Sequence, residues 1–176
     1  GQQTDLDVAA TFAERKEGVR GSGRATEGVD RHVGAAIGPV AGGAADIATL
    51  ATPFASAGEW NSTAEVKVAR AVDGRALYFS RAPIPWHRDE MSEGANSLPQ
   101  ALVPQRHIGI YAYRAAFLRQ FVQWPPAALE EAEQLEQLRA LYNGMAIHVD
   151  EACADVPAGV DTAEDLAMVR GLLGDA

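Results

Sequence analysis

Asp161 and Arg81 are charged side chains at positions where the chain changes direction, and each could bind a ligand. Asp161 follows Gly159 and precedes a predicted helix, so its carboxylate lies between a strand end and a helix start. Such a carboxylate can hold Mg²⁺, which takes oxygen ligands and often only one or two carboxylates. A helix cap is the competing interpretation, and the residues alone favour it because Asp is a common N-cap.

Arg81 comes after a predicted strand and directly before a Pro-containing turn. A guanidinium held on such a rigid backbone is suited to gripping a carboxylate through paired hydrogen bonds. A surface arginine is the alternative, and the residues alone favour that alternative.

His107 and Tyr111 share one face of a predicted strand. Residues 106–113 alternate, with apolar side chains on one face and these two residues on the other. Each combines an apolar body with a hydrogen-bonding group, which suits sugar hydroxyls, although such residues are more often structural. No residue in the sequence is identifiable as an orienting partner for His107, so it is not predicted to be a general base.

Glu136 and Gln137 lie off the leucine stripe of a predicted helix, on neighbouring faces about 100° apart. A solvated helix surface is the plain interpretation of both. Glu130, Glu131 and Glu133 precede them and are expected to form a solvated acidic face.

Strands and helices alternate from residue 46 onward, which indicates the α/β class. Asp73-Gly74 favours a tight turn between two strands, and residues 90–105 are expected to form a surface loop. The predicted strands are 47–52, 66–72, 76–79, 106–113 and 147–149, and the predicted helices are 115–124, 128–143 and one that begins near Thr162.

Residues 1–45 differ in composition from the rest of the chain. Nine of the 17 glycines lie there, and Phe12 is the only aromatic residue. We expect mostly irregular structure with at most a short helix over 8–16. A flexible appendage and a reading-frame or gene-boundary error are the two explanations, and the abrupt change at Asp46 favours the second.

The overall composition is that of an ordinary globular domain, with 176 residues of which 47% are apolar. A formal charge of −9 argues against nucleic acid or an anionic membrane as a partner, because both require clustered Lys and Arg. Cys153 is the single cysteine, and no signal peptide or membrane-spanning run is apparent. We therefore expect a soluble cytoplasmic protein with a small-molecule substrate.

Four strings of residues, in this order and spacing, resemble the distal part of one enzyme family. They are Ala-Leu-Tyr-Phe-Ser-Arg-Ala-Pro-Ile-Pro-Trp (76–86), Arg-His-Ile-Gly-Ile-Tyr-Ala-Tyr-Arg (106–114), Leu-Glu-Gln-Leu-Arg-Ala-Leu (135–141) and Gly-Val-Asp-Thr-Ala-Glu-Asp-Leu (159–166). The family is that of the 3-deoxy-manno-octulosonate cytidylyltransferases, also called CMP-Kdo synthetases. The resemblance covers about residues 46–173.

The resemblance implies a nucleotidyltransferase that transfers CMP from CTP to Kdo, with release of pyrophosphate, for lipopolysaccharide biosynthesis. It implies a homodimer, an Mg²⁺ cofactor and a Rossmann-like three-layer α/β/α sandwich, here incomplete, with residues 46–176 as the C-terminal part of the domain. It assigns no catalytic residue. It places Asp161 as a metal ligand and implies Kdo contacts from Arg81, His107, Tyr111, Glu136 and Gln137.

Two nucleotide-binding features of the family have no counterpart in the sequence. One is a loop with Arg, Ser and Gly-Lys-Pro that holds the triphosphate, and the other is a second magnesium carboxylate in a Gly-Asp-Glu-Pro string. We therefore expect absent or impaired turnover, with marginal stability or reliance on a partner chain. Two alternatives are a cytidylyltransferase for another sugar acid, such as an acylneuraminate, and a non-catalytic sugar-acid-binding fragment.

Overall fold

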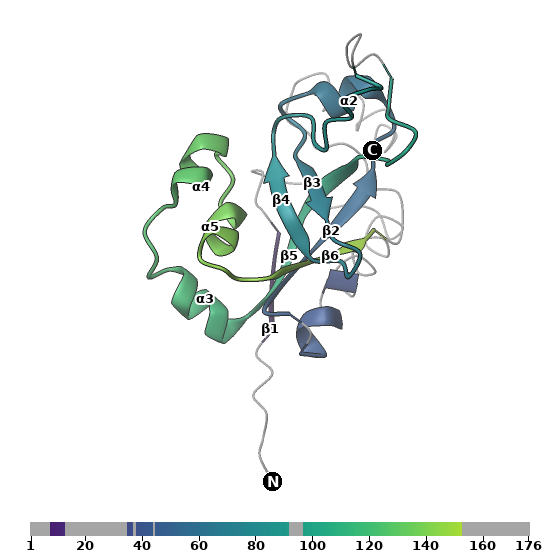
Figure 1. The fold of residues 1–176 in the computed structure, drawn as a ribbon. Coiled ribbons are helices and arrows are strands. Elements are labelled where there is room, and N and C mark those ends of the chain that lie inside the picture. Colours follow the sequence, from purple (N-terminus) through teal and green to yellow (C-terminus); the bar gives the residue numbers. More distant parts are fainter. Residues whose placement is uncertain (1–7, 13–34, 37, 44, 92–96, 153–176) are drawn as a thin grey trace, which may run out of the picture.

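The computed structural model describes residues 8–12, 35–36, 38–43, 45–91 and 97–152. These form a six-stranded mixed sheet with short helices against it, so the α/β prediction is confirmed (Figure 1). In chain order the elements are β1 (Val8–Phe12), β2 (Ile47–Pro53), α2 (Ala57–Asn61), β3 (Lys67–Arg70), β4 (Ala76–Ser80), β5 (Gln105–Arg114), α3 (Ala115–Phe121), α4 (Ala128–Glu133), α5 (Gln137–Tyr142) and β6 (Ile147–Glu151).

The ten-residue strand β5 organises the sheet. The strand order is β4-β3-β5-β2-β6, and β1 pairs with β5 outside this path. Only β2 and β6 run parallel, and the other pairs are antiparallel. The first two residues of β5 pair with β3, while its second half, from Ile110 to Arg114, pairs with β1. The strand predicted to carry His107 and Tyr111 is therefore central.

The described parts of the first forty-five residues contain regular structure. Val8–Phe12 is the strand β1, so the short helix expected over 8–16 is wrong for these residues. Val8, Thr11 and Phe12 are residue types that favour strands, and the ladder with β5 outweighs the helical pattern. Residues 38–41 are helical, and Val40 among them is buried.

The β3–β4 hairpin turns at Asp73-Gly74, as the sequence predicts. Gly74 has φ of +83°, a conformation that glycine adopts at little cost. The Asp73 carboxylate accepts a hydrogen bond of 3.0 Å from the backbone N–H of Arg75. The later segment expected as a surface loop is anchored at Met91, which is buried in a small cluster with Phe54.

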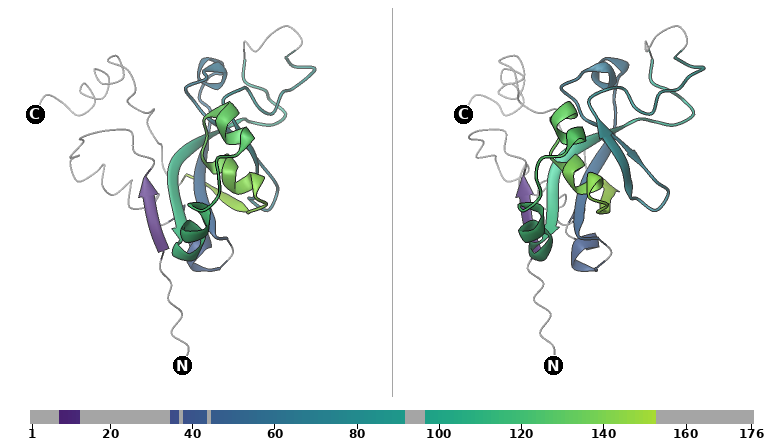
Figure 2. Two further views of the ribbon diagram at one scale, coloured as in Figure 1. Left: turned by 90° about the vertical axis from the view of Figure 1, so that its left-hand side faces the viewer. Right: turned by 60° about the vertical axis from the view of Figure 1, so that its left-hand side comes forward.

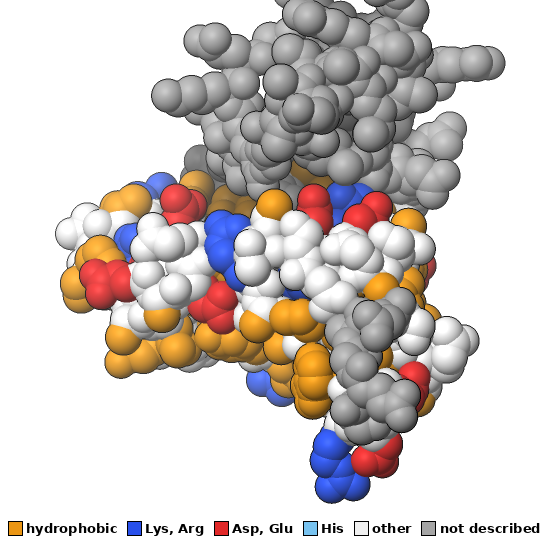
Figure 3. Space-filling view, turned by 90° about the horizontal axis from the view of Figure 1, so that it is seen from above, with side chains coloured by type: hydrophobic (Ala, Val, Ile, Leu, Met, Phe, Trp, Pro, Cys, Tyr) orange, Lys and Arg blue, Asp and Glu red, His pale blue; other side chains and the backbone are white. Residues whose placement is uncertain are grey.

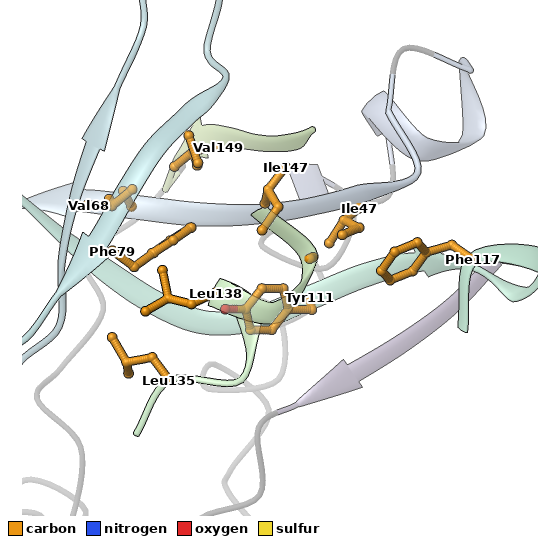
Figure 4. Close-up of a cluster of buried hydrophobic side chains, with 12 residues drawn as sticks. Ile47, Val68, Phe79, Tyr111, Phe117, Leu135, Leu138, Ile147 and Val149 are labelled. Carbon is orange, nitrogen blue, oxygen red and sulfur yellow. The ribbon is translucent and has the colours of Figure 1, made fainter. Parts of the chain in front are cut away.

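Helices α3, α4 and α5 lie together on one side of the sheet (Figure 2). Their buried side chains, among them Phe117 and Leu138, pack with Ile47, Phe79 and Tyr111 of the sheet in the larger core cluster (Figure 4). A second cluster lies on the opposite face of β2 and β5. There, apolar side chains of the two strands pack with residues near the helical turn at 38–41. Its buried members are Ala36, Val40, Ala48, Leu50, Ile108 and Ala112.

The single helix predicted over 128–143 is two helices, α4 and α5, so that prediction is wrong. Gln134 ends α4 with φ of +54°, in the left-handed region that non-glycine residues seldom adopt. Contacts from the end of β4, described below, hold the chain there. The predicted helix over 115–124 is confirmed as α3, whereas the helix expected near Thr162 falls outside the described residues.

Candidate functional site

A row of aromatic rings follows one face of β5. His107 and Tyr111 do share a face, as the alternation predicts, with ring centroids 5.3 Å apart. Tyr113 stacks on Tyr111 at 5.5 Å, and Phe79 of β4 meets His107 edge-on at 5.0 Å. These contacts fix the rings against the side of the sheet that the helices cover.

A cavity of about 50 Å³ lies between this row and helix α5. It brings together three of the residues predicted to bind the substrate, Tyr111, Glu136 and Gln137, because the α4–α5 break places the start of α5 over β5. The complete lining is Ile47, Tyr111, Tyr113, Phe117, Phe121, Glu136, Gln137, Ala140 and Ile147. The opening thus combines an apolar wall with a carboxylate, an amide and a phenol.

The phenol of Tyr111 is buried, and its hydroxyl has no hydrogen-bond partner in the part of the chain that the structure describes. Buried polar groups are nearly always paired, so an unpaired hydroxyl on a residue that lines a cavity is a candidate ligand contact. Burial, assisted by the neighbouring Tyr113 and by Glu136, raises the pKa of Tyr111 well above its ordinary value. The group therefore stays protonated and can donate a hydrogen bond.

His107 has a partner that the sequence did not reveal. The hydroxyl of Thr49, a fully buried residue of β2, lies 2.9 Å from the His107 Nε2. Burial lowers the pKa of His107 to about 3, so the imidazole is neutral near pH 7 and a weak base. The sequence indicated this contact only through the position of Thr49, two residues after Ile47 and therefore on the same face of the predicted strand.

Arg81 lies just beyond β4 and does not line the cavity. Its Nε and Nη1 each donate a 2.9 Å hydrogen bond, to the carbonyls of Glu133 and Thr63, and Nη2 reaches the Gln134 carbonyl at 3.5 Å. The guanidinium thus holds the turn between α4 and α5. The structure brings Tyr111, Glu136 and Gln137 to one cavity with His107 beside Tyr111, and places Arg81 behind the turn that precedes α5.

The expected solvated acidic face is wrong for two of its three residues. Glu133 accepts hydrogen bonds from the Ser80 hydroxyl (2.7 Å) and the Arg81 backbone N–H (2.9 Å). Glu130 is buried, and its pKa is lowered by hydrogen bonds from Arg139 on α5. Only Glu131 is exposed as expected. The carboxylates of Glu130 and Glu133 thus bind neighbouring elements of the fold, whereas the acidic face was expected to be solvated.

Lys67, which the sequence analysis did not include in the site, is fully buried at the start of β3. Its Nζ donates to the carbonyls of Ser62 (2.6 Å), Glu65 (2.9 Å) and Arg81 (2.8 Å). Burial lowers its pKa, although three carbonyl acceptors compensate the ammonium. Lys67 therefore fixes the backbone of Arg81.

Asp161, the predicted metal ligand, falls outside the described residues. Within the described ranges no three His, Cys, Asp or Glu side chains are grouped so that they could hold a metal ion. No helix in that same part of the chain is long and apolar enough to cross a bilayer.

Comparison with known proteins decides the family. The sequence profile of the family described as "Cytidylyltransferase" matches residues 24–147. The chain belongs to the cytidylyltransferase family. The match begins ahead of Asp46, so family-like sequence in this cytidylyltransferase starts earlier than the four strings indicated.

The relatives confirm the resemblance to the 3-deoxy-manno-octulosonate cytidylyltransferases. The enzyme of that name from Cellvibrio japonicus is 55% identical over 130 residues, which cover 73% of this chain and 51% of the relative. The one from Alcanivorax borkumensis is 61% identical over 101 residues, which cover 57% and 40%. The chain thus spans about half the length of the curated relatives it matches.

A solved structure supports the fold. CMP:2-keto-3-deoxy-manno-octonic acid synthetase, in complex with CTP, superposes with a TM-score of 0.65 and 39% sequence identity. The superposition covers 77% of this chain and 52% of the solved one. The expectation of an α/β nucleotidyltransferase fold is therefore confirmed.

Proposed function

We propose that this chain forms the sugar-acid side of a CMP-Kdo synthetase, which transfers CMP from CTP to Kdo and releases pyrophosphate. The relatives supply the reaction and the solved neighbour is bound to CTP. The observation that carries the assignment to this chain is Tyr111, whose side chain lines a cavity with Glu136 and Gln137 and whose buried hydroxyl is unpaired among the described residues. A sugar acid offers hydroxyls and ring oxygens that such a group can pair with, and the cavity of about 50 Å³ would take only one part of that molecule.

In the proposed reaction the anomeric hydroxyl oxygen of Kdo attacks the α-phosphorus of CTP. The new oxygen–phosphorus bond forms as the bond to the bridging oxygen breaks, pyrophosphate leaves, and the hydroxyl proton passes to solvent. Catalysis of this kind depends mainly on positioning. Tyr111, Glu136 and Gln137 would hold the sugar acid, and His107, with its pKa lowered to about 3, would contribute a neutral contact rather than a base.

Arg81 stays in this proposal as the residue that would face the sugar-acid carboxylate. Two of its nitrogens are engaged by backbone carbonyls at 2.9 Å, so its guanidinium is already oriented. A guanidinium carries five N–H donors, so those two bonds and the 3.5 Å contact of Nη2 with the Gln134 carbonyl leave two donors for a carboxylate. Arg81→Lys would keep the charge and lose the planar fork, and should weaken Kdo binding.

The test is a calorimetric titration of the full chain with Kdo, followed by a pyrophosphate-release assay with CTP, Kdo and Mg²⁺. We expect heat of binding from Kdo that excess N-acetylneuraminate does not abolish, with turnover absent or well below that of a full-length relative. Displacement by N-acetylneuraminate at equal concentration would favour another sugar acid. No binding of either sugar acid would contradict the proposal.

Mg²⁺ is the cofactor we propose, with Asp161 as one ligand, on the strength of the Gly-Val-Asp-Thr string alone. The ion would neutralise charge on the phosphates of CTP. Asp161→Asn should weaken Mg²⁺ binding, measured by titration in the presence of CTP, while Kdo binding persists. The predicted cytoplasmic location stays a prediction.

A homodimer is the assembly we propose. A groove of about 650 Å³ runs beside the β3–β4 hairpin, and hydrophobic side chains are exposed on the described surface (Figure 3). Val72, Leu77, Leu102 and Val103 line the groove and are exposed, which is an apolar surface that a second copy would cover. Sedimentation equilibrium should give twice the chain mass, and Leu77→Glu should give the monomer mass.

A further inference from the structure

The pairing of β2 with β5 is interrupted beside the candidate site. Thr49 lies opposite Tyr111, but the next residue, Leu50, lies opposite Ile108, so two residues of β5 have no partner on β2. Bulges of this kind are common beside functional sites, where they redirect side chains. Because two residues are inserted, His107 and Tyr111 remain on the same face of β5.

The Thr49 hydroxyl occupies the gap in the ladder. Its Oγ1 lies 2.7 Å from the carbonyl oxygen of Ile110 and 3.0 Å from that of Ile108. Both acceptors are carbonyls, so the single hydroxyl hydrogen must point toward them. The lone pairs of Oγ1 are left for a donor.

The His107 Nε2 is that donor, at 2.9 Å from Oγ1. Since the hydroxyl hydrogen is already given to a carbonyl, the contact forms only when Nε2 carries the ring proton. In the neutral ring Nδ1 then has the lone pair and can only accept a hydrogen bond.

We propose that Thr49 is a positioning residue that holds His107 as its Nε2–H tautomer and so presents Nδ1 as a hydrogen-bond acceptor. The inference rests on the proposed function and deepens it. His107 adjoins the cavity through its ring contact with Tyr111 and does not itself line it. A neutral acceptor pairs with a sugar hydroxyl and not with a carboxylate, so a contact between His107 and the sugar acid would be to a hydroxyl. The ring contacts with Phe79 and Tyr111 keep the imidazole in the required orientation.

Nitrogen-15 NMR of the histidine rings in the full chain at pH 7 tests the tautomer without any variant. We expect a slowly exchanging ring proton bonded to Nε2 of His107, with Nδ1 at the chemical shift of an unprotonated nitrogen. A proton on Nδ1 would overturn the inference. This reading does not depend on whether Kdo binds.

Two variants then test the role of Thr49. Thr49→Val keeps the shape and removes the hydroxyl, whereas Thr49→Ser keeps the hydroxyl. We expect the His107 ring proton to exchange at least tenfold faster in Thr49→Val, with Kdo affinity reduced about tenfold, and Thr49→Ser to restore both. Unchanged exchange and affinity in a folded Thr49→Val chain would refute the positioning role. If Kdo fails to bind the unmodified chain, the proposed function fails, and the exchange rates still decide the role of Thr49.

Discussion

The two faces of the sheet differ in what they bury. The face covered by α3, α4 and α5 carries aromatic rings and large aliphatic side chains, together with the polar groups of Thr49, His107 and Tyr111. The opposite face, in its described part, is built mainly from small residues, and Val40 and Leu50 are among its few larger ones. The buried polar groups and the large buried side chains thus occur on the same side.

The two faces also differ in how they bury polar side chains. On the helix-covered face Thr49 and His107 pair with each other, whereas Tyr111 lines a cavity and its buried hydroxyl has no hydrogen-bond partner among the described residues. On the other face, the buried residues of β2 and β5 are apolar, namely Ala48, Leu50, Ile108 and Ala112. A ligand site fits the first face because Tyr111, with its unpaired hydroxyl, lines a cavity there.

Truncation of one leucine on each face should show the largest difference between them. Leu138 and Leu50 are both fully buried, so the residue type and exposure are matched. Leu138→Ala should lower the free energy of unfolding by about 4 kcal/mol, and Leu50→Ala by about 2 to 3 kcal/mol, because small neighbours can collapse around the cavity. Urea denaturation measures both. Equal losses would contradict the packing difference.

The pH dependence of stability tests the lowered pKa of His107. Burial lowers its pKa from the ordinary 6.5 to about 3, so below pH 6.5 the unfolded chain takes up a proton that the folded chain does not. The contribution of the neutral imidazole to the free energy of unfolding is therefore fully present above pH 6.5 and is lost as the pH falls toward 3. Between pH 6.5 and 5 the free energy of unfolding should drop by about 2 kcal/mol from this group.

His107→Gln supplies the control for that measurement, since Gln retains a donor for Thr49 and does not titrate. Its unfolding free energy should fall less than that of the unmodified chain over the same pH interval. Parallel curves for the two chains would rule out a buried neutral imidazole.

Glu133 and Glu131 provide a matched pair of carboxylates on one helix. Glu133→Ala removes two hydrogen bonds to the end of β4 and should cost about 2 kcal/mol. Glu131 is exposed, and Glu131→Ala should change the free energy of unfolding by less than about 0.5 kcal/mol. Thermal unfolding of both variants checks this. If the two losses are alike, the α4–α5 turn is not held by Glu133.

The smallest expected effect concerns two glycines with similar backbones. Gly74 has φ of +83° and Gly144 has φ of +79°, but only at Gly74 would a Cβ meet a neighbour, 2.8 Å from the His148 ring. Gly74→Ala should therefore destabilise the chain by about 1 kcal/mol more than Gly144→Ala does. Chemical denaturation of the two variants gives this difference, and its absence would show that the His148 ring moves aside freely.

Much of the fold was predictable because periodicity is local. Alternation placed His107 and Tyr111 on a common face of β5, and Asp73-Gly74 identified the hairpin. The α4–α5 break was not predictable, since Gln134 takes its left-handed conformation beside long-range contacts from Arg81. The strand β1 depends on pairing with β5, about a hundred positions away.

The candidate site shows the same limit. Family strings pointed to Tyr111, Glu136 and Gln137, which the fold brings to one cavity. Thr49 and Lys67 were missed, because their importance comes from partners distant in the sequence or from complete burial of a charge. Single-residue properties do not encode such contacts.

Kdo titrations of Tyr111→Phe and Tyr142→Phe test the central claim most directly. Tyr111 is buried with an unpaired hydroxyl, whereas Tyr142 is 60% exposed and does not line the cavity. Tyr111→Phe should raise the free energy of unfolding by about 1 kcal/mol, since it removes an unsatisfied group, and should weaken Kdo binding about tenfold. Tyr142→Phe should change neither quantity. Undiminished Kdo affinity in Tyr111→Phe would contradict the assignment of this cavity to the sugar acid.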